Sequence, residues 1–287
     1  MTTKHEPHCD RVSDPIGVFD SGVGGLSVLT ALITELPLER FIYVADSGHA
    51  PYGERDDSHV IARSHAITDY LIRQHHIKVL VVACNTATAA AIKHLRSRYP
   101  QLPIVGIEPA LKPAAAQSKT GLIGVMATRG TLNSEKFHAL LESLHGKATF
   151  VLQPCDGLAD AIEQDNTTKM IAACAMYTRA MGTFGNKFSE MDSLVLGCTH
   201  YPFVSDTLRQ CVGPSVAFFE GGAPVARQTR RILTDAGTLV SASGPSTPPA
   251  VPTLAAHFCT SGNPEMLRSA VARWLAIQVE QPAQILV

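Results

Sequence analysis

Two of the seven cysteines stand where their thiols could act as acid and base. Cys84 and Cys198 each follow an apolar run of strand length, and each precedes two polar residues. A free thiol has a pKa of about 8.5, so near neutral pH it can accept a proton as thiolate and return one as thiol. Two thiols on opposite sides of one carbon could remove a proton from one face and return one to the other, which inverts a stereocentre.

The polar neighbours indicate what each thiol would have around it. Asn85, Thr86 and Thr199 could bind a carboxylate, and His200 could exchange a proton with Cys198. No two cysteines have CxxC spacing and their number is odd, which argues against a zinc site or a disulfide framework and favours a reducing compartment. The histidines have no metal-ligand spacing, so we expect no metal. Four cysteines have no organised group of polar residues around them, and we expect them to be small buried hydrophobic residues: Cys9, Cys174, Cys211 and Cys259.

Length and composition indicate a globular protein of two domains. The chain has 287 residues, enough for two domains of about 150 residues each. Hydrophobic residues make up 45% and charged residues 17%, which is typical of a folded chain. The net charge of −1 gives no support to nucleic-acid binding. No apolar run approaches the about 18 residues of a membrane span, and the polar N-terminus lacks a signal-peptide core, so we expect a cytoplasmic protein without membrane contact.

Apolar runs alternate with helix-like segments along the chain. Strands rich in Val and Ile that alternate with helices indicate an α/β fold with parallel sheets covered on both faces. Ligands in such folds bind beyond the carboxyl ends of the strands, where both candidate thiols stand. A stretch rich in Ser, Pro and Thr at 241–253 is typical of a surface loop. The predicted strands lie at 16–19, 41–45, 78–83, 103–107, 121–126, 148–152, 193–197, 216–219 and 254–262.

Two pairs of segments suggest a concealed repeat. Residues 16–21 resemble residues 123–128, because both are strands that end at a hydroxyl residue before a glycine-containing turn. Residues 81–86 resemble residues 195–200, because in both an apolar strand leads through a small residue to Cys and two polar residues. The pairs occur in the same order and at similar separations. We therefore predict two related α/β halves that place the two thiols on opposite walls of a cleft.

A glycine-rich turn at residues 20–27 follows the first strand and opens a helix. It fits the dinucleotide-binding pattern poorly, since Ser27 stands where the third glycine belongs, and no phosphate-loop lysine follows. Asp20 beside Ser21 suits a cation such as a substrate ammonium, and Asp20 could also orient a neighbouring thiol. Both residue types are favoured helix N-caps, so capping is the competing interpretation.

Two further polar segments follow predicted strands. The turn at 46–55, which contains Pro51, Tyr52 and Gly53, could direct backbone N–H groups at a ligand, although its composition also fits a plain loop. Thr128 stands at the start of a helix, where it could contact an anion or cap the helix. Either segment would lie at the same edge of the predicted sheets as the thiols.

The chain resembles the glutamate racemases of the cofactor-independent aspartate/glutamate racemase superfamily over about residues 15 to 235. The combination of its motifs is specific to that family. A weaker match is the spacing between Cys155 and Glu163, where Asp156 replaces the usual proline. The matching motifs, in family order, are FDSGVGGLSV (19–28), PYGER (51–55), ACNTATA (83–89), ATRGT (127–131) and LGCTHYPF (196–203).

This resemblance implies a two-thiol mechanism without a cofactor. Cys84 would remove the α-proton of D-glutamate and Cys198 that of L-glutamate. Asp20 would support Cys84, His200 would support Cys198, and Glu163 is a weaker candidate for proton handling behind them. The substrate-binding positions would be Asp20 and Ser21 for the ammonium, Asn85, Thr86 and Thr199 for the α-carboxylate, Pro51, Tyr52 and Gly53 for the side-chain carboxylate, with Thr128 and His200 beside them.

The resemblance also implies an architecture and a role. Two pseudo-symmetric α/β domains, residues 1–107 with 216–287 and residues 108–215, would enclose an interdomain active-site cleft. The product would be D-glutamate for peptidoglycan synthesis in a bacterial cytoplasm. Racemases of this kind often dimerise, through different faces in different members, so a homodimer stays open.

Three segments depart from the family, and alternatives to it remain. The tail before Asp14, residues 220–222 and the stretch at 241–253 bear on regulation, including activation by a cell-wall precursor, and not on the thiols. The alternatives are a racemase for another amino acid, aspartate above all, and a two-domain protein that binds an amino acid without turning it over. A relative that uses a single thiol and a nucleotide-binding enzyme fit less well.

Overall fold

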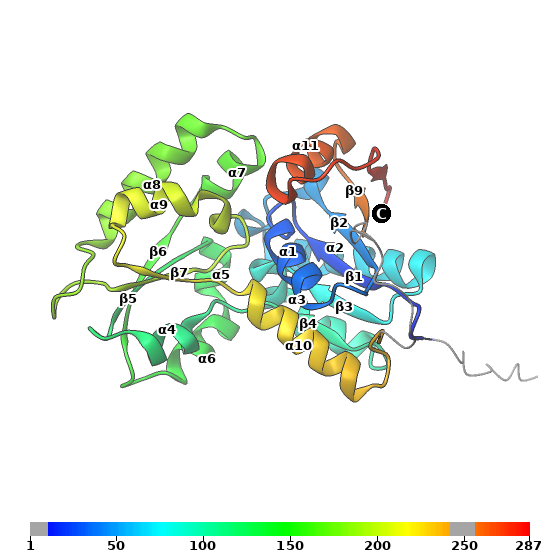
Figure 1. Ribbon diagram of the computed structural model, residues 1–287, viewed down its shortest axis with the longest axis horizontal. Helices are drawn as coiled ribbons and strands as arrows, with labels where there is room; N and C mark the ends of the chain where they lie inside the picture. The colour runs from blue at the N-terminus through cyan, green and yellow to red at the C-terminus, as the bar shows by residue number, and fades with distance from the viewer. Residues whose placement is uncertain (1–10, 242–255) are drawn as a thin grey trace, which may run out of the picture.

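The computed structural model describes residues 11–241 and 256–287, which form two lobes side by side (Figure 1). Each lobe is a parallel sheet with helices on both faces, which confirms the predicted α/β class. The predictions for Cys9, for the tail up to residue 10 and for residues 242–253 lie outside the described residues.

The first lobe is built on a sheet with the strand order β10-β9-β2-β1-β3-β4. Strand β1 is central, and its Gly17 is paired with Ile42 on one side and Leu80 on the other. Every residue of β1, β2 and β3 is buried, because helices cover both faces of the sheet. The strands are β1 (Ile16–Asp20), β2 (Phe41–Ala45), β3 (Val79–Val82), β4 (Ile104–Gly106), β9 (Ala256–Thr260) and β10 (Ala283–Gln284).

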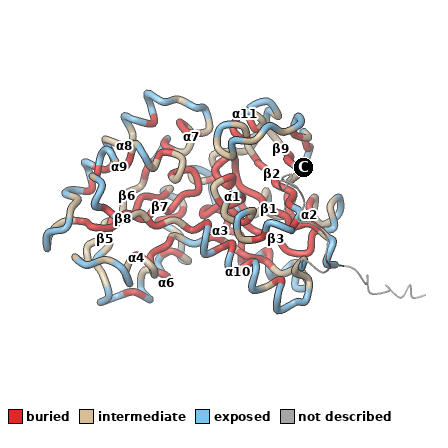
Figure 2. The backbone as a smooth tube through the Cα atoms, viewed as in Figure 1, coloured by how far each residue is buried: buried red, intermediate tan, exposed pale blue. Residues whose placement is uncertain are grey.

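Separate apolar cores fill the two faces of this sheet. One face packs against α1 (Leu26–Glu35), α10 (Gly222–Asp235) and α11 (Pro264–Leu275), and the other against α2 (Asp57–His75) and α3 (Asn85–Arg98). Two 3-10 turns, η1 (Ser47–His49) and η2 (Tyr52–Glu54), follow β2. Buried backbone concentrates in the strands and exposed backbone on the outer helices (Figure 2).

The second lobe has a smaller sheet with the order β6-β5-β7-β8. Its strands are β5 (Leu122–Ala127), β6 (Thr149–Pro154), β7 (Ser193–Leu196) and β8 (Ala217–Phe219). One face packs against α4 (Leu111–Gln117), α5 (Arg129–Asn133) and α6 (Glu135–Glu142). The other packs against α7 (Leu158–Glu163), α8 (Thr167–Met181), α9 (Ser205–Val212) and the 3-10 turn η3 (Tyr201–Val204).

The two sheets share one strand order, which agrees with the predicted repeat. The order β2-β1-β3-β4 in the first lobe corresponds to β6-β5-β7-β8 in the second. Cys84 and Cys198 therefore occupy equivalent positions, just after β3 and β7. The chain arrives at both thiols from a buried parallel strand, so their backbone positions are set by the sheets.

Strand β8 differs from the expected division of the chain. We expected residues from 216 onward to belong to the first domain, but β8 is bonded to β7, with Phe218 aligned to Leu194. A short apolar strand is favourable there because it covers the free edge of β7. The chain reaches the first lobe only at α10, which packs against α1 (Figure 1). We therefore propose that the second domain extends to residue 219.

Candidate active site

A cavity of about 220 Å³ lies between the lobes, at the carboxyl ends of both sheets. Cys84 lines it from the first lobe and Cys198 from the second, and both are buried. Asp20 is the one predicted site residue that does not line the cavity. The predicted residues that line it with the thiols are Ser21, Pro51, Tyr52, Gly53, Asn85, Thr86, Thr128, Glu163, Thr199 and His200.

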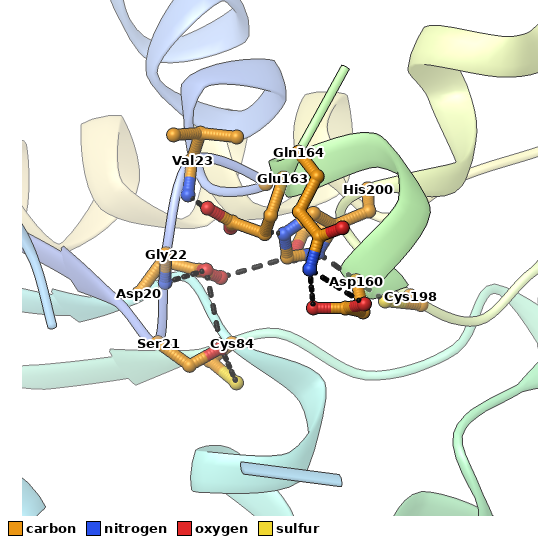
Figure 3. Close-up of polar contacts among 12 residues, drawn as sticks. Asp20, Ser21, Gly22, Val23, Cys84, Asp160, Glu163, Gln164, Cys198 and His200 are labelled. Atoms are coloured by element: carbon orange, nitrogen blue, oxygen red, sulfur yellow. Dashed lines mark hydrogen bonds and ion pairs between the residues drawn. The ribbon is translucent and has the colours of Figure 1, made fainter. Parts of the chain in front are cut away.

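Cys84 is held at the start of α3 by contacts to its sulfur. The Ala87 N–H donates to Cys84 Sγ at 3.4 Å, so the thiol occupies the N-cap position. The thiol donates to Ser21 Oγ at 3.7 Å, and Ser21 donates to Asp20 Oδ1 at 3.4 Å (Figure 3). Asp20 is therefore connected to Cys84 through a hydroxyl.

Asp20 lies behind the cavity wall and is fully buried. Its carboxylate accepts the Gly22 N–H at 2.8 Å and the Thr199 hydroxyl at 3.0 Å. Burial raises the pKa of Asp20 to about 6, although the positive charge of His200 opposes the rise. Helix α1 begins after Gly25 with no capping side chain, so the competing prediction that Asp20 or Ser21 caps this helix is wrong.

The Cys84 thiol favours its neutral form. Burial, followed by the negative charge of Asp20, raises the pKa of Cys84 to about 12. The Ala87 N–H and Ser21 oppose this rise, but burial dominates because a thiolate loses more hydration than a thiol. At neutral pH Cys84 is therefore a proton donor.

Cys198 has a different partner, the imidazole of His200. Nδ1 of His200 lies 3.6 Å from Cys198 Sγ, and Nε2 lies 2.6 Å from Glu163 Oε1. Burial by itself would lower the pKa of His200, but these two contacts outweigh it and leave the pKa well above its ordinary value. The protonated imidazole can stabilise negative charge on the neighbouring sulfur.

Glu163 connects the two lobes. It ends α7 in the second lobe, and its Oε1 accepts the Val23 N–H of the first lobe at 2.6 Å (Figure 3). The same carboxylate faces His200, so one side chain contacts both the glycine-rich turn and the imidazole.

The turn after β2 forms another wall of the cavity. The Tyr52 hydroxyl donates to Asp46 Oδ2 at 2.5 Å, and Arg63 donates to both oxygens of Asp46 at 2.9 Å. Burial would raise the pKa of Asp46, but the hydrogen bonds from Arg63 and Ser261 hold it below its ordinary value. The charged carboxylate thus fixes Tyr52 from behind.

Hydroxyl and amide groups face each other at a further part of the cleft. Thr86 Oγ1 lies 3.0 Å from Thr128 Oγ1, across the two lobes. Thr128 also caps α5, because its hydroxyl oxygen accepts the Thr131 N–H at 3.2 Å. This confirms the prediction that Thr128 caps a helix. Among the described residues, Asn85 has a buried side-chain oxygen without a hydrogen-bond partner beside the cavity.

Comparison with known proteins agrees with this geometry. The family model Asp/Glu/Hydantoin racemase matches residues 24–229. The chain belongs to this family. The glutamate racemase of Ectopseudomonas mendocina is 50% identical over 220 residues, which cover 76% of this chain and 82% of that protein.

Solved structures of racemases match the whole two-lobed arrangement. An isoform of glutamate racemase from Bacillus anthracis aligns with a TM-score of 0.78 at 30% identity, covering 94% of this chain and 99% of that one. Glutamate racemase from Escherichia coli, solved with L-glutamate and the activator UDP-MurNAc-Ala, aligns with a TM-score of 0.76 at 28% identity, covering 91% and 95%. This chain is therefore an isomerase of the racemase class.

Some residues of the racemase cavity carry little or no signal in the sequence. Cys155, noted only for its spacing to Glu163, lines the cavity as a third buried thiol, and burial raises its pKa. Asn263 and Met266 reach the cavity from the start of α11, and no motif marks them. Of the cysteines expected to be buried, Cys174 and Cys259 are, whereas Cys211 is exposed, because it lies on the outer side of α9.

Within residues 11–241 and 256–287, no three or more His, Cys, Asp or Glu side chains are grouped so that they could hold a metal ion. None of the helices in these ranges has the length and apolar character needed to span a bilayer.

Proposed function

We propose that this racemase interconverts L- and D-glutamate through the thiols of Cys84 and Cys198, without a cofactor. The observation that carries the proposal is that two thiols, at equivalent strand ends of two lobes, line one cavity. Glutamate as substrate is supported by the relatives, which are glutamate racemases, and by the L-glutamate bound in the Escherichia coli enzyme.

One thiolate removes the α-proton and the opposite thiol returns a proton. From L-glutamate, the Cys198 thiolate takes the α-proton and becomes a thiol, leaving a carbanion at the α-carbon. The Cys84 thiol then protonates the carbanion from the other face, which gives D-glutamate and a Cys84 thiolate. One proton enters one sulfur as another leaves the second, so charge is conserved, and D-glutamate reacts by the same steps in reverse.

The different neighbours of the two thiols suit these starting states. Cys84, with a pKa of about 12, begins as a thiol and is a ready proton donor to a carbanion. Asp20, with a pKa of about 6, can exchange a proton with Cys84 through Ser21 near neutral pH. A protonated His200, held by Glu163, compensates the charge of a Cys198 thiolate.

The polar walls of the cavity suit the three charged groups of glutamate. Because Asp20 is buried behind Ser21, we propose that the ammonium contacts the Ser21 hydroxyl while the charge of Asp20 attracts it from behind. The α-carboxylate is assigned to Asn85, Thr86 and Thr199. The side-chain carboxylate is assigned to the backbone of Tyr52 and Gly53, next to Pro51 and Thr128.

The biological role follows from the product. We propose that D-glutamate made by this chain is used for peptidoglycan synthesis, and that the reaction takes place in the cytoplasm. A homodimer remains a proposal from the family resemblance, which sedimentation of the purified protein in the presence and absence of glutamate would test.

The proposed reaction is tested by incubating the purified protein with L-glutamate, and separately with D-glutamate, in deuterated water without added cofactor. Optical rotation and α-deuterium are followed together. We expect optical rotation to fall towards zero from both enantiomers while deuterium enters the α-position, because the second thiol carries a deuteron from the solvent.

Other outcomes would identify the alternatives. Exchange with aspartate but not with glutamate would move the substrate to aspartate. Binding of glutamate, measured by calorimetry, without any α-exchange would indicate a binding protein and would overturn the proposal. Loss of activity on removal of a bound aldehyde cofactor would contradict the cofactor-free mechanism.

A further inference from the structure

The glycine-rich turn between β1 and α1 meets the second lobe at very short range. A Cβ added at Gly22 would lie 1.8 Å from Glu163 Oε1, and one added at Gly24 would lie 2.3 Å from His200 Nδ1. Neither glycine has a backbone conformation in the left-handed region, so the turn by itself would accept alanine at both positions. The facing lobe, and not the turn, is what requires glycine there.

Hydrogen bonds hold the second lobe against this turn. The Val23 N–H donates to Glu163 at 2.6 Å, and Ser27 Oγ donates to the Thr199 carbonyl at 2.8 Å. The Thr199 hydroxyl also donates to Asp20 at 3.0 Å. The contacts lie on both sides of Gly24, so they fix where His200 and its neighbours stand relative to the first lobe.

We infer that Gly22 and Gly24 are positioning residues for the reaction. They form the contact surface on which Glu163 and His200 dock, and this docking places the imidazole beside Cys198. The inference rests on the proposed glutamate racemisation for its kinetic meaning. Gly22 acts through Glu163, which orients the far nitrogen of the imidazole. Gly24 leaves the space that Nδ1, the nitrogen facing Cys198, occupies.

The kinetic test is a double-mutant cycle between Gly22 and Glu163. Misplacing a catalytic group by about 1 Å can cost about 100-fold in rate, so we expect Gly22→Ala to lower kcat by about that factor. If the methyl group acts by displacing Glu163, then Gly22→Ala in a Glu163→Ala background lowers kcat by less than about twofold more. Effects that simply multiply would overturn the inference.

An isotope effect separates positioning from general damage. L- and D-glutamate have equal free energies, so in every variant the kcat/KM value for one enantiomer must equal that for the other. A slower proton transfer at Cys198 makes that step more rate-limiting. The α-deuterium isotope effect on kcat/KM should therefore rise with L-glutamate and fall with D-glutamate in Gly22→Ala. An unchanged pair of isotope effects would contradict the inference.

Docking is also visible without turnover, through the chain's single tryptophan. Trp274 on α11 of the first lobe stacks on Phe203 of the second, with ring centroids 4.4 Å apart. We expect Gly22→Ala to shift the tryptophan emission to longer wavelength, and the Glu163→Ala background to abolish that shift. An unshifted spectrum in Gly22→Ala would count against docking.

Gly237→Ala is the matched control. Gly237 is an exposed glycine with φ +67° and no atom within 4 Å of an added Cβ, so its substitution strains the backbone far from the cavity. We expect its kcat and its emission to equal those of the wild type, and a loss as large as that of Gly22→Ala would overturn the inference. Wild-type protein that fails to racemise glutamate would defeat the proposed function, while the emission shift would still decide the docking.

Discussion

His200 Nε2 lies 2.6 Å from Glu163 Oε1, a residue 37 positions earlier in the chain. The contact gives Cys198 a positively charged neighbour, whereas Cys84 has the Ser21 hydroxyl backed by the carboxylate of Asp20. The two halves thus repeat their strands but not their acid–base partners. Different partners suit a reaction in which one sulfur must begin as thiolate and the other as thiol.

Each reacting thiol is expected to be indispensable for inversion but not for exchange on its own face. A serine hydroxyl is far too weak an acid and base here, so Cys84→Ser and Cys198→Ser should each lower racemisation by at least about 1,000-fold. In deuterated water, Cys84→Ser should still exchange the α-proton of L-glutamate slowly, and Cys198→Ser that of D-glutamate. Proton NMR of the α-position measures both.

Cys155→Ser is the matched control for these two substitutions. Its thiol lines the same cavity and is also buried, but it donates to the Gln153 carbonyl at 3.4 Å, and its side-chain partner is Tyr201 and not an imidazole or a carboxylate-backed hydroxyl. We expect it to keep racemisation within about threefold of the wild type, a loss below about 1 kcal/mol. Near wild-type racemisation in either Cys84→Ser or Cys198→Ser would defeat the two-thiol mechanism.

Asp20→Asn is expected to stabilise the protein at neutral pH while it abolishes activity. The pKa of Asp20 is about 6 in the folded protein against an ordinary 3.8, so the folded state holds this proton more strongly. Stability is therefore lost as pH rises from about 4 to about 6, by about 1.4 kcal/mol per pKa unit. The neutral amide avoids this loss, so the variant should gain about 2–3 kcal/mol at pH 7.

Urea unfolding of wild type and Asp20→Asn between pH 4 and pH 8 measures this gain. The two proteins should converge at pH 4, where Asp20 is protonated in both states, and separate above pH 6. A variant that is less stable than the wild type at pH 7 would show that the carboxylate is favourable in its site. That result would show that the Asp20 carboxylate does not destabilise the folded protein, so no stability is lost at this position for the sake of function.

The strands that lead to the thiols were predictable because each is an uninterrupted run of apolar residues that is followed by polar residues. The position of Cys84 after β3 and of Cys198 after β7 follows from that pattern. Strand β8 was expected in the first domain but pairs with β7, because three residues say nothing about which sheet edge will accept them.

The contacts behind the cavity wall join residues that are far apart in the chain, either within the first lobe or between the two lobes, and no local pattern records them. Ser21 stands between Asp20 and Cys84, and Val23 contributes only its backbone to Glu163. Arg63 lies within the polar helix α2, and its place in the sequence predicts a side chain that faces solvent. Its side chain is instead largely buried and pairs with the buried carboxylate of Asp46.

A buried ion pair at the other end of the first sheet is expected to control stability. Lys78 Nζ lies 2.6 Å from Glu39 Oε2, and neither side chain is exposed by more than 1%. Lys78 also donates to the Val12 and Thr238 carbonyls. Lys78→Met leaves the Glu39 carboxylate buried with the Val240 N–H as a donor but without a positive charge, which should cost about 3–5 kcal/mol.

The midpoint of urea unfolding checks this loss, with Lys136→Met as its control. Lys136 pairs with Glu108 at the surface, where such a pair contributes less than about 1 kcal/mol. Lys78→Met with Glu39→Leu should recover part of the stability, since no charge is then left buried. Equal losses from Lys78→Met and Lys136→Met would mean that the buried pair is well hydrated.

Arg63 is expected to set substrate affinity although it does not line the cavity. It donates twice to Asp46, and Asp46 accepts the hydroxyl of Tyr52 at the cavity wall. Arg63→Met would leave this buried carboxylate without its charged partner and loosen the turn. A hydrogen bond to a charged group contributes about 1.5–3 kcal/mol, so KM for glutamate should rise at least about tenfold. Because both thiols are elsewhere, kcat should fall by less than about threefold.

Steady-state kinetics in both directions separate the two quantities. Arg73→Met is the control, because Arg73 lies on the same helix and is exposed, and its KM should equal that of the wild type. Tyr52→Phe removes only the hydroxyl that Asp46 accepts, so it should raise KM by a smaller factor in the same direction. A fall in kcat at unchanged KM in Arg63→Met would mean that this arginine acts on the thiols and not on the wall proposed to hold the side-chain carboxylate.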